Sequence, residues 1–323
     1  MRTITYSQAL AEAQAEEMRR DPGIVLLGLE ITTIGSIFGQ TAGLYKEFGK
    51  DRVMDMPLSE SGYNGMAIGM AMGGIRTIVE TQFADFLAYS FDAIANQAAK
   101  YRYNMDGKES LPLVIRAPQG ELMYAGPNHS QIAESWFMNV PGLKIVVPSN
   151  PYDAKGLLKT AIRDDDPVLF LEHAALCFTK GEVPEEEYTI PFGQAKVVKT
   201  GNDVTIIATQ QMVYESIKAA EALQKEGINV EIIDPRTLVP LDKRTIFTSV
   251  KKTGRVVITH ESPRRGGIGG EISAVITENC FHDLKAPILR VASANFPNPA
   301  GPQHNFLMPN KEDIIAAVKE TLE

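Results

Sequence analysis

Short apolar runs alternate with longer amphipathic stretches along most of the chain, and this alternation restricts the possible folds more than any other feature. In the first half, strands are predicted at residues 24–28, 77–81, 113–116, 143–147 and 168–172. These runs are apolar almost throughout, as expected for parallel strands that are covered on both faces. Helical patterns separate them at residues 7–20, 60–73, 86–103 and 151–163. The sequence therefore predicts an α/β fold with a parallel sheet.

The length of 323 residues favours two domains, because a single core rarely grows past about 250–300 residues. Residues 181–193 are acidic, flanked by proline and without periodicity, so they are predicted to link a domain at 1–180 to one at 194–323. The alternation then restarts, with strands predicted at 204–209, 230–233, 255–260 and 288–291 and helices at 214–226, 241–250, 268–281 and 313–322.

Composition excludes several classes of protein. The chain has 32 lysines and arginines against 40 aspartates and glutamates, and this acidic balance argues against nucleic-acid binding. Its two cysteines lie far apart, so neither a disulfide framework nor a zinc site is expected, which favours the reducing cytoplasm. The chain starts without a signal-peptide pattern. Its apolar stretch at residues 66–75 is too short and too rich in glycine to span a membrane.

The predicted helix at 60–73 begins with Glu60 and then carries glycine at every fourth position, at Gly65, Gly69 and Gly73. Each interior glycine costs roughly 1 kcal/mol relative to alanine, so the bare face indicates that another backbone packs closely against it. Glu60 is either a partner of the helix dipole or a functional carboxylate. Phe86 follows a predicted parallel strand at the carboxyl end, where ligands bind. Together with Leu58, these residues offer an apolar shelf, a carboxylate and a stacking surface for a heteroaromatic ring.

Three further segments are candidates for function. His129 lies in a loop broken by glycines, and it either moves protons or belongs to a cluster that caps a helix. The loop at 264–271 either holds an anion at a helix N-terminus or forms a tight interdomain or intersubunit turn. Its spacing favours the turn, because it lacks the Gly-x-Gly-x-x-Gly pattern. Asp164, Asp165 and Asp166 follow a helix whose dipole they oppose, so this run is either a solvated helix end or a cation site.

Nine segments, taken in order, resemble the beta subunit of the thiamine-diphosphate-dependent decarboxylating component of 2-oxo acid dehydrogenase complexes. They are residues 48–53, 57–60, 82–86, 98–103, 129–131, 140–144, 147–157, 234–237 and 252–255. The resemblance implies a pyrimidine-type thiamine diphosphate-binding domain followed by a transketolase C-terminal-like domain. It implies decarboxylation of pyruvate or a branched-chain 2-oxo acid, or cleavage of acetoin, with the acyl group passed to a lipoyl-bearing acyltransferase. It also implies an alpha subunit in a tetramer of two alpha and two beta chains.

The resemblance also implies roles for individual residues. Glu60 would hydrogen-bond the N1′ nitrogen of the aminopyrimidine ring, with Leu58 and Phe86 against the cofactor, and His129 would lie near the substrate. The family's structural potassium site would fall on Leu113, Ala161, Ile162, Asp164 and Asp166, mostly through carbonyl oxygens. The Gly-Asp-Gly motif that holds magnesium and diphosphate is missing from this sequence. We therefore expect half a cofactor site here, with magnesium held mainly by the alpha subunit.

Four departures from the family leave the substrate open. They are Leu29 after the first strand, Ser36 in a loop that lacks the usual doubled glycine, Asn128 before His129, and the tail at 297–306. One alternative function is the C-terminal half of a split transketolase, although the strand-end loops are poor in the Arg and His that sugar phosphates need. Another alternative is a non-catalytic scaffold, against which the intact Glu60 argues.

Overall fold

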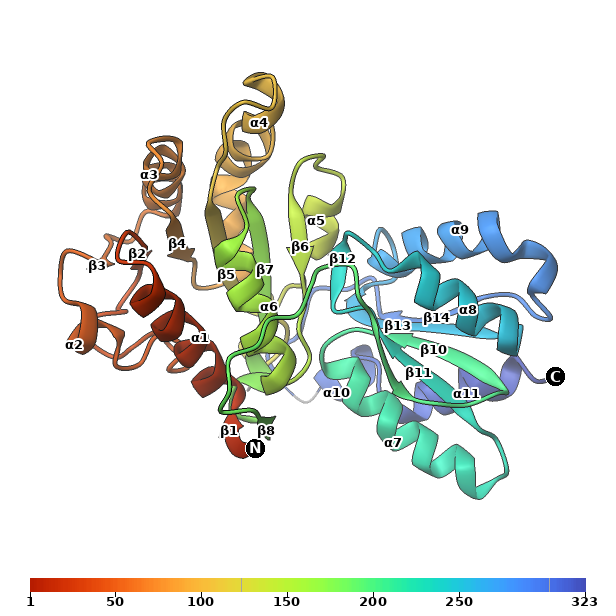
Figure 1. The fold of residues 1–323 in the computed structure, drawn as a ribbon. Coiled ribbons are helices and arrows are strands. Elements are labelled where there is room, and N and C mark those ends of the chain that lie inside the picture. The colour runs from red at the N-terminus through yellow and green to blue at the C-terminus, as the bar shows by residue number, and fades with distance from the viewer. Residues whose placement is uncertain (123, 302) are drawn as a thin grey trace. The chain divides into compact units, whose positions relative to one another are not determined.

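The computed structural model describes residues 1–122, 124–301 and 303–323, and the chain forms two compact α/β units (Figure 1). The first unit comprises residues 1–120 and 136–192, and the second comprises residues 121–135 and 193–323. Among the described residues, none of the helices has the length and apolar character needed to cross a membrane. The α/β prediction is confirmed, whereas the domain boundaries at 1–180 and 194–323 stay a prediction.

The first unit is built on a parallel sheet whose strands follow the order β6-β7-β5-β4-β2-β3. The strands are β2 (Val25–Gly28), β3 (Val53–Asp55), β4 (Thr77–Glu80), β5 (Leu113–Gln119), β6 (Lys144–Val146) and β7 (Val168–His173). All five strands predicted for the first half are present. The sequence did not reveal β3, which has only three residues, too few to show a pattern.

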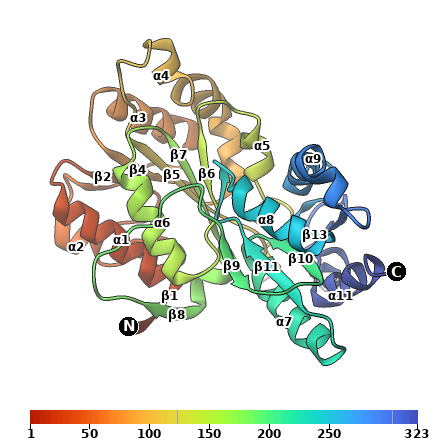
Figure 2. The same cartoon turned by 45° about the vertical axis from the view of Figure 1, so that its right-hand side comes forward.

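Helices α1 (Tyr6–Arg20), α3 (Glu60–Met72) and α6 (Pro151–Arg163) confirm three predicted helices, and α2 (Leu44–Phe48) adds a short one. The Asn150 side chain caps α6 by accepting from the Asp153 backbone at 3.0 Å, as its position before a proline favours. Helices α1 and α6 lie side by side in both ribbon views (Figures 1 and 2). Helix α5 (Glu134–Met138) spans the division of the chain between the units.

The helix predicted at 86–103 is present in part, as a helical stretch of mixed type rather than one α-helix. Its pieces are the 3₁₀-helix η1 (Ala84–Ser90), the π-helix η2 (Ala93–Ala98) and the short helix α4 (Tyr101–Asn104). Piece η1 is a 3₁₀-helix, in which side chains three residues apart eclipse, and this places Phe86 and Tyr89 in a stack with ring centroids 6.3 Å apart. Phe91 instead packs on Phe137 at 5.1 Å. The aromatic side chains thus contact different neighbours.

The linker predicted at residues 181–193 begins with a β-strand rather than with irregular chain. Strand β8 (Lys180–Val183) pairs antiparallel with β1 (Arg2–Thr5), and the 3₁₀-helix η3 (Ala174–Phe178) precedes it. The residues after β8 are irregular but packed on α6. The Tyr188 hydroxyl donates to the Tyr152 carbonyl at 2.8 Å, and the Ile190 amide donates to the Gly156 carbonyl at 3.2 Å. This segment is therefore a strap of the first unit rather than a free tether.

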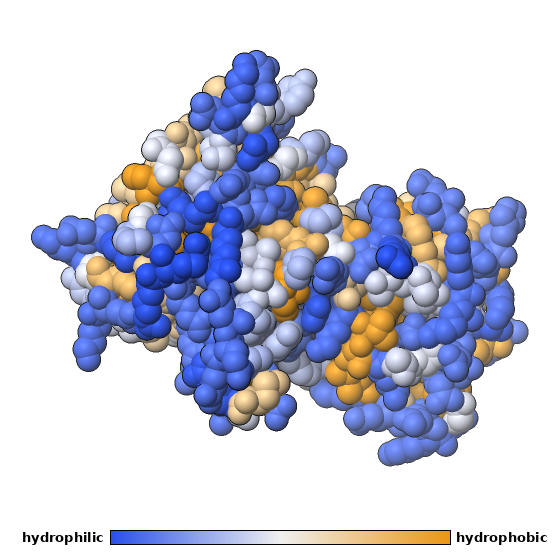
Figure 3. Space-filling view, viewed as in Figure 1, coloured by the Kyte–Doolittle hydropathy of each residue, from blue (hydrophilic) through white to orange (hydrophobic). Residues whose placement is uncertain are grey.

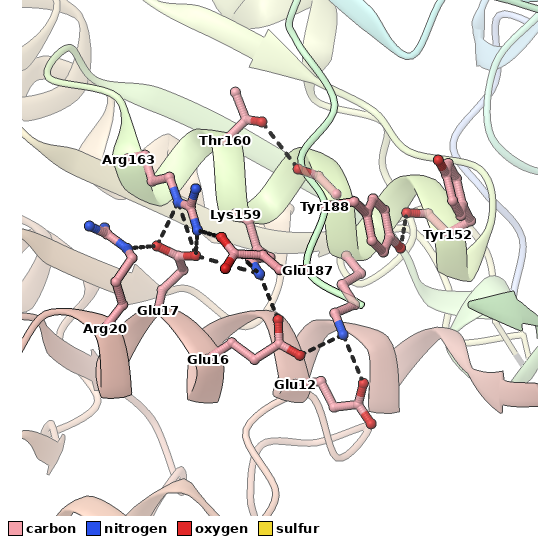
Figure 4. Close-up of polar contacts among 12 residues, drawn as sticks. Glu12, Glu16, Glu17, Arg20, Tyr152, Lys159, Thr160, Arg163, Glu187 and Tyr188 are labelled. Atoms are coloured by element: carbon pink, nitrogen blue, oxygen red, sulfur yellow. Dashed lines mark hydrogen bonds and ion pairs between the residues drawn. The ribbon is translucent and has the colours of Figure 1, made fainter. Parts of the chain in front are cut away.

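Ion pairs hold α1, α6 and this strap together (Figure 4). Lys159 of α6 is almost fully buried and donates to Glu16 of α1 at 2.6 Å. Arg163 donates to Glu17 at 2.7 Å, and its guanidinium also binds Glu187 of the strap. These charged side chains are long enough to cross between two helices, and their pairing offsets the cost of burying them.

The second unit has a five-stranded sheet in the order β14-β13-β10-β11-β9, in which only β9 runs antiparallel to its neighbour. Its elements are β9 (Lys196–Lys199), β10 (Val204–Ala208), α7 (Gln211–Lys225), β11 (Val230–Asp234), β12 (Thr237–Val239), α8 (Lys243–Thr253), β13 (Val256–Pro263), α9 (Ile268–Cys280), η4 (Phe281–Asp283), β14 (Leu289–Ser293), α10 (His304–Leu307) and α11 (Lys311–Glu320). The strands and helices predicted for this half are present. Its apolar core joins β10 and β11 to α7 and α11.

Candidate functional site

Glu60 is the first residue of α3, and Ser59 before it makes no side-chain capping bond. The Glu60 side chain is buried, with the residue 9% exposed. In the part of the chain that the structure describes, no hydrogen bond reaches its carboxylate. Its oxygens are not sealed from solvent, so a donor from outside the described chain can reach them. Its place at the positive end of the helix dipole favours a negative charge there.

The first turns of α3 are fixed by a polar side chain beneath Glu60. The Asn64 amide donates at 3.0 Å to the Glu60 carbonyl, to the Thr81 hydroxyl and to the Ser90 hydroxyl. These bonds tie the start of α3 to the end of β4 and to η1. Burial, together with the nearby Glu60 charge, raises the pKa of the Tyr63 phenol well above its ordinary value. The residues that follow Glu60 in α3 are therefore a neutral phenol, Tyr63, and a hydrogen-bonded amide, Asn64.

The two apolar residues predicted beside Glu60 differ in exposure. Phe86 lies just beyond the carboxyl end of β4, as predicted, and is half-buried in its stack with Tyr89. Leu58 is 81% exposed, so it does not cover Glu60 within this chain. Leu58, Glu60 and Phe86 all belong to the first unit. Their roles toward a cofactor stay a prediction.

The glycine face of α3 is open. A methyl group added at Gly65 or at Gly69 would meet nothing within 4 Å among the described residues. Met66 and Met72 flank this face and are 45% and 38% exposed. Figure 3 shows pale and orange surface in the region of α3. The bare face expected from the sequence is therefore present, and no described residue packs against Gly65 or Gly69.

His129 belongs to the second unit and is exposed. Its backbone amide donates to the Gly126 carbonyl at 3.3 Å, and the next carbonyl, of Ser130, accepts from the Asn298 amide at 2.5 Å. The following helix, α5, begins only at Glu134, so the alternative in which this cluster caps a helix is not what the structure shows.

The loop at 264–271 is a tight turn. A Cβ at Gly267 would lie 2.5 Å from the His260 ring and 2.5 Å from the Pro263 carbonyl, so only glycine fits there. His260 is fully buried, with its Nδ1 atom 2.7 Å from the Ser262 hydroxyl, and burial lowers its pKa to about 4. Close packing on His260 accounts for Gly267 and Gly269, because a Cβ at Gly269 would also lie 2.6 Å from its ring.

Side-chain cations meet the acidic run that follows α6. The Arg76 guanidinium donates to the carbonyls of Ile162 and Asp164 at 2.8 and 2.6 Å. Lys144 donates to both carboxylate oxygens of Asp164 at 2.7 Å, and Arg102 binds Asp166. Among the described residues, no group of three or more His, Cys, Asp and Glu side chains is arranged to hold a metal ion.

Sequence reasoning missed a buried charge cluster at the centre of the sheet. Arg116 of β5 donates to Glu80 of β4 at 2.9 Å and to Glu172 of β7 at 2.6 Å, and all three side chains are fully buried. Burial raises the pKa of Glu172 to about 7, against the opposing effect of Arg116. Glu80 also accepts from Gln82 at 3.0 Å, which anchors the start of the loop that leads to Phe86. The one signal in the sequence was that each of three predicted apolar strands carries a single charged residue at or near its end.

Comparison with known proteins shows full-length similarity. The family described as Transketolase, pyrimidine binding domain matches residues 2–178, and the family described as Transketolase, C-terminal domain matches residues 193–314. The 2-oxoisovalerate dehydrogenase subunit beta of Bacillus subtilis is 45% identical to this chain, and the pyruvate dehydrogenase E1 component subunit beta of Staphylococcus aureus is 46% identical. Each alignment covers 100% of both chains.

One solved structure described as a split gene transketolase, inactive beta4 tetramer, has a TM-score of 0.79 and 25% identity to this chain. The alignment covers 99% of this chain and 98% of that one. This likeness and the two matched domains agree in order and extent with the predicted fold, a pyrimidine-binding domain followed by a transketolase C-terminal domain.

Proposed function

Because this chain belongs to the transketolase-like family that includes the E1 beta subunits of 2-oxo acid dehydrogenases, we propose that it is such a beta subunit. In this proposal the assembled enzyme decarboxylates a 2-oxo acid, or cleaves acetoin, and passes the acyl group to a lipoyl-bearing acyltransferase. The observation that carries it is Glu60, a largely buried residue at the start of α3 whose accessible carboxylate has no hydrogen-bond partner in the described chain.

The family's domains imply thiamine diphosphate, and the residues of the first unit fit its ring. Glu60 would hold a proton at the N1′ ring nitrogen, and no described side chain competes for its accessible carboxylate. The half-buried ring of Phe86 offers a flat face to the pyrimidine, and Leu58 an apolar contact. When bound, this cofactor stabilises the carbanion that forms when the substrate loses its carboxyl group.

Magnesium is proposed to be held mainly by the alpha subunit. The nearest match to a Gly-Asp-Gly motif is Asp106-Gly107, which lies in a turn after α4 where both residues have positive φ. Asp106 is exposed there and faces Lys108 at 3.5 Å. This turn offers one carboxylate already facing a cation, which is too little for an octahedral magnesium site.

An alpha subunit also accounts for the open face of α3. Gly65 and Gly69 have room for another backbone, and the flanking methionines offer adaptable apolar contacts. We propose that the partner packs there, in a tetramer of two alpha and two beta chains. The partner would thereby cover Leu58 and complete the pocket around Glu60.

His129 is proposed to act near the substrate during acyl transfer, where an imidazole stabilises developing negative charge or moves a proton. We also place the enzyme in the cytoplasm, because Cys177 and Cys280 are both buried free thiols.

The test is turnover by this chain co-purified with its alpha subunit, with pyruvate, a branched-chain 2-oxo acid, acetoin and a ketose phosphate as separate donors. The two relatives above carry names for different substrates, so the first three donors are compared directly. We expect turnover of at least one of them and none of the ketose phosphate. Turnover of the ketose phosphate alone would establish the split-transketolase alternative.

Glu60→Gln is expected to lower that turnover by about 10²–10⁴-fold, because an amide cannot hold the proton at N1′. The matched control is Glu221→Gln, at an exposed position of α7, which should leave turnover unchanged. Full activity of the Glu60→Gln enzyme would leave only the scaffold alternative or a different base.

A further inference from the structure

Arg76 lies in the connection between α3 and β4. Its side chain contacts the end of α6, the acidic run after it and Asp21 after α1. Its guanidinium is largely buried, and one Nη atom donates to the carbonyls of both Ile162 and Asp164 at the end of α6. The other Nη atom donates to the Asp165 carboxylate at 2.5 Å. Its Nε atom also faces Asp21 at 4.0 Å. A single side-chain cation thus lies where the last carbonyls of a helix meet an acidic run.

The end of α6 concentrates negative charge. The last carbonyls of a helix have no intrahelical partner, and they carry the negative end of the helix dipole. Three consecutive aspartates, Asp164, Asp165 and Asp166, add to this charge. The charge of these three carboxylates is matched by three side-chain cations from other elements, Arg76, Lys144 and Arg102. The acidic run therefore does not need a bound ion to balance it.

The oxygens that the family resemblance assigned to potassium overlap with those bound by these side chains. Arg76 binds the Ile162 and Asp164 carbonyls, and Lys144 binds the Asp164 and Asp166 carboxylates. A potassium ion on the same carbonyls would lie within a few ångströms of the guanidinium. Like charges at that separation repel strongly outside bulk water. Two of the five assigned residues, Ile162 and Asp164, thus have carbonyls bound by a guanidinium, which does not fit a resident potassium ion there.

We propose that the Arg76 guanidinium replaces a structural monovalent cation at the end of α6, so that the first unit folds without potassium. Arg76 is then a positioning residue for the edge of the sheet. The Asp165 carbonyl accepts from the Leu111 amide at 2.9 Å, and the Pro112 carbonyl accepts from the Thr77 amide at 3.0 Å. The side chain that holds the acidic run therefore also fixes the start of β5 beside the start of β4.

The test is thermal unfolding of the full chain in equal concentrations of potassium, sodium and choline chloride. The single tryptophan of the sequence, Trp136, lies in the first unit, so its fluorescence follows that unit. The wild-type midpoint should be the same in all three salts. Arg76→Ala should lower it by at least about 3 °C in choline chloride, and potassium should restore part of that loss.

Two variants accompany that comparison. Arg244→Ala removes an exposed arginine of α8 and should leave the midpoint unchanged in every salt. Arg76→Lys keeps one positive charge but not the forked geometry, so its midpoint should lie between those of wild type and Arg76→Ala. If Arg76→Ala does not fold, the wild-type salt series and Arg76→Lys still test the proposal.

Crystals soaked in thallium(I), which replaces potassium and scatters anomalously, give a direct readout. Wild-type crystals should show no thallium at the carbonyls of Ile162 and Asp164, whereas Arg76→Ala crystals should show it there. A wild-type chain that is stabilised by potassium relative to choline, or that binds thallium at these carbonyls, would overturn the proposal and establish the potassium site.

Discussion

The two units differ in what their interiors contain. In the first unit, Arg116, Glu80 and Glu172 are fully buried across three neighbouring strands. In the second unit, the sheet and helices α7 and α11 enclose an apolar core, and the buried polar contacts beside it include the hydroxyls of Thr205 and Ser249, 2.7 Å apart. The first unit thus has an ion-paired arginine at the centre of its sheet and an open face on α3. The cofactor site and partner surface that we propose both lie on the first unit.

Breaking the charge cluster should have the largest effect on stability. Arg116→Met leaves Glu80 and Glu172 buried without their shared cation, and removing one partner of a buried ion pair costs roughly 3–5 kcal/mol. Urea unfolding followed by Trp136 fluorescence measures the loss. The matched control is Arg244→Met on the surface of α8, expected within about 0.5 kcal/mol of wild type. A loss below about 1 kcal/mol for Arg116→Met would show that the cluster contributes little.

The two units should respond to pH in opposite directions. Burial raises the pKa of Glu172 to about 7, so the folded first unit holds a proton that the unfolded chain releases. Its stability should fall as pH rises from about 4.5 to about 7. Burial, with a smaller effect of Arg290, lowers the pKa of His260 to about 4. The unfolded second unit therefore binds the extra proton, and its stability should rise between about pH 4 and 6.5.

Each unit contains one buried cysteine that reports on its opening, Cys177 in the first and Cys280 in the second. Pulsed thiol labelling in urea, read out by peptide mass spectrometry at several pH values, gives both midpoints from one sample. Glu172→Gln should remove the pH dependence of the unfolding midpoint measured at Cys177. It should leave the pH dependence measured at Cys280 unchanged. Unfolding midpoints that shift with pH in the same direction at both cysteines would contradict the opposite pH responses of the two units.

The smallest effect on stability is expected at the open face of α3. Gly65→Leu adds a side chain where nothing lies within 4 Å, and it improves helix propensity by up to about 1 kcal/mol. The chain alone should be as stable as wild type or slightly more so, but it should not co-purify with the alpha subunit. Ala316→Leu, at an exposed position of α11, serves as the control for added bulk and should co-purify normally. Normal assembly of the Gly65→Leu chain would place the partner elsewhere.

The sequence predicted those features that depend on local patterns. The apolar runs at β2, β4, β5 and β7 are continuous, and Asn150 before Pro151 is a strong helix start. It did not predict features that depend on which residues meet in space. Glu80, Arg116 and Glu172 are each one charged residue in an apolar run, and only strand order brings them together.

The candidate site shows the same limit. Glu60 and the glycines of α3 follow from spacing within one helix, and both were predicted. The acidic run at 164–166 was recognised as unusual, but its explanation depends on Arg76, Lys144 and Arg102, which come from distant parts of the chain. A periodic pattern cannot report such pairings, because the partners share no fixed spacing.

The most direct test of the account is calorimetric titration of thiamine diphosphate and magnesium into this chain alone, the alpha subunit alone, and the two together. We expect saturable binding only for the mixture, and a much weaker signal when the mixture contains Glu60→Gln. Tight binding by this chain alone, or binding and turnover that Glu60→Gln leaves unchanged, would contradict the claim that Glu60 belongs to half of a shared cofactor site.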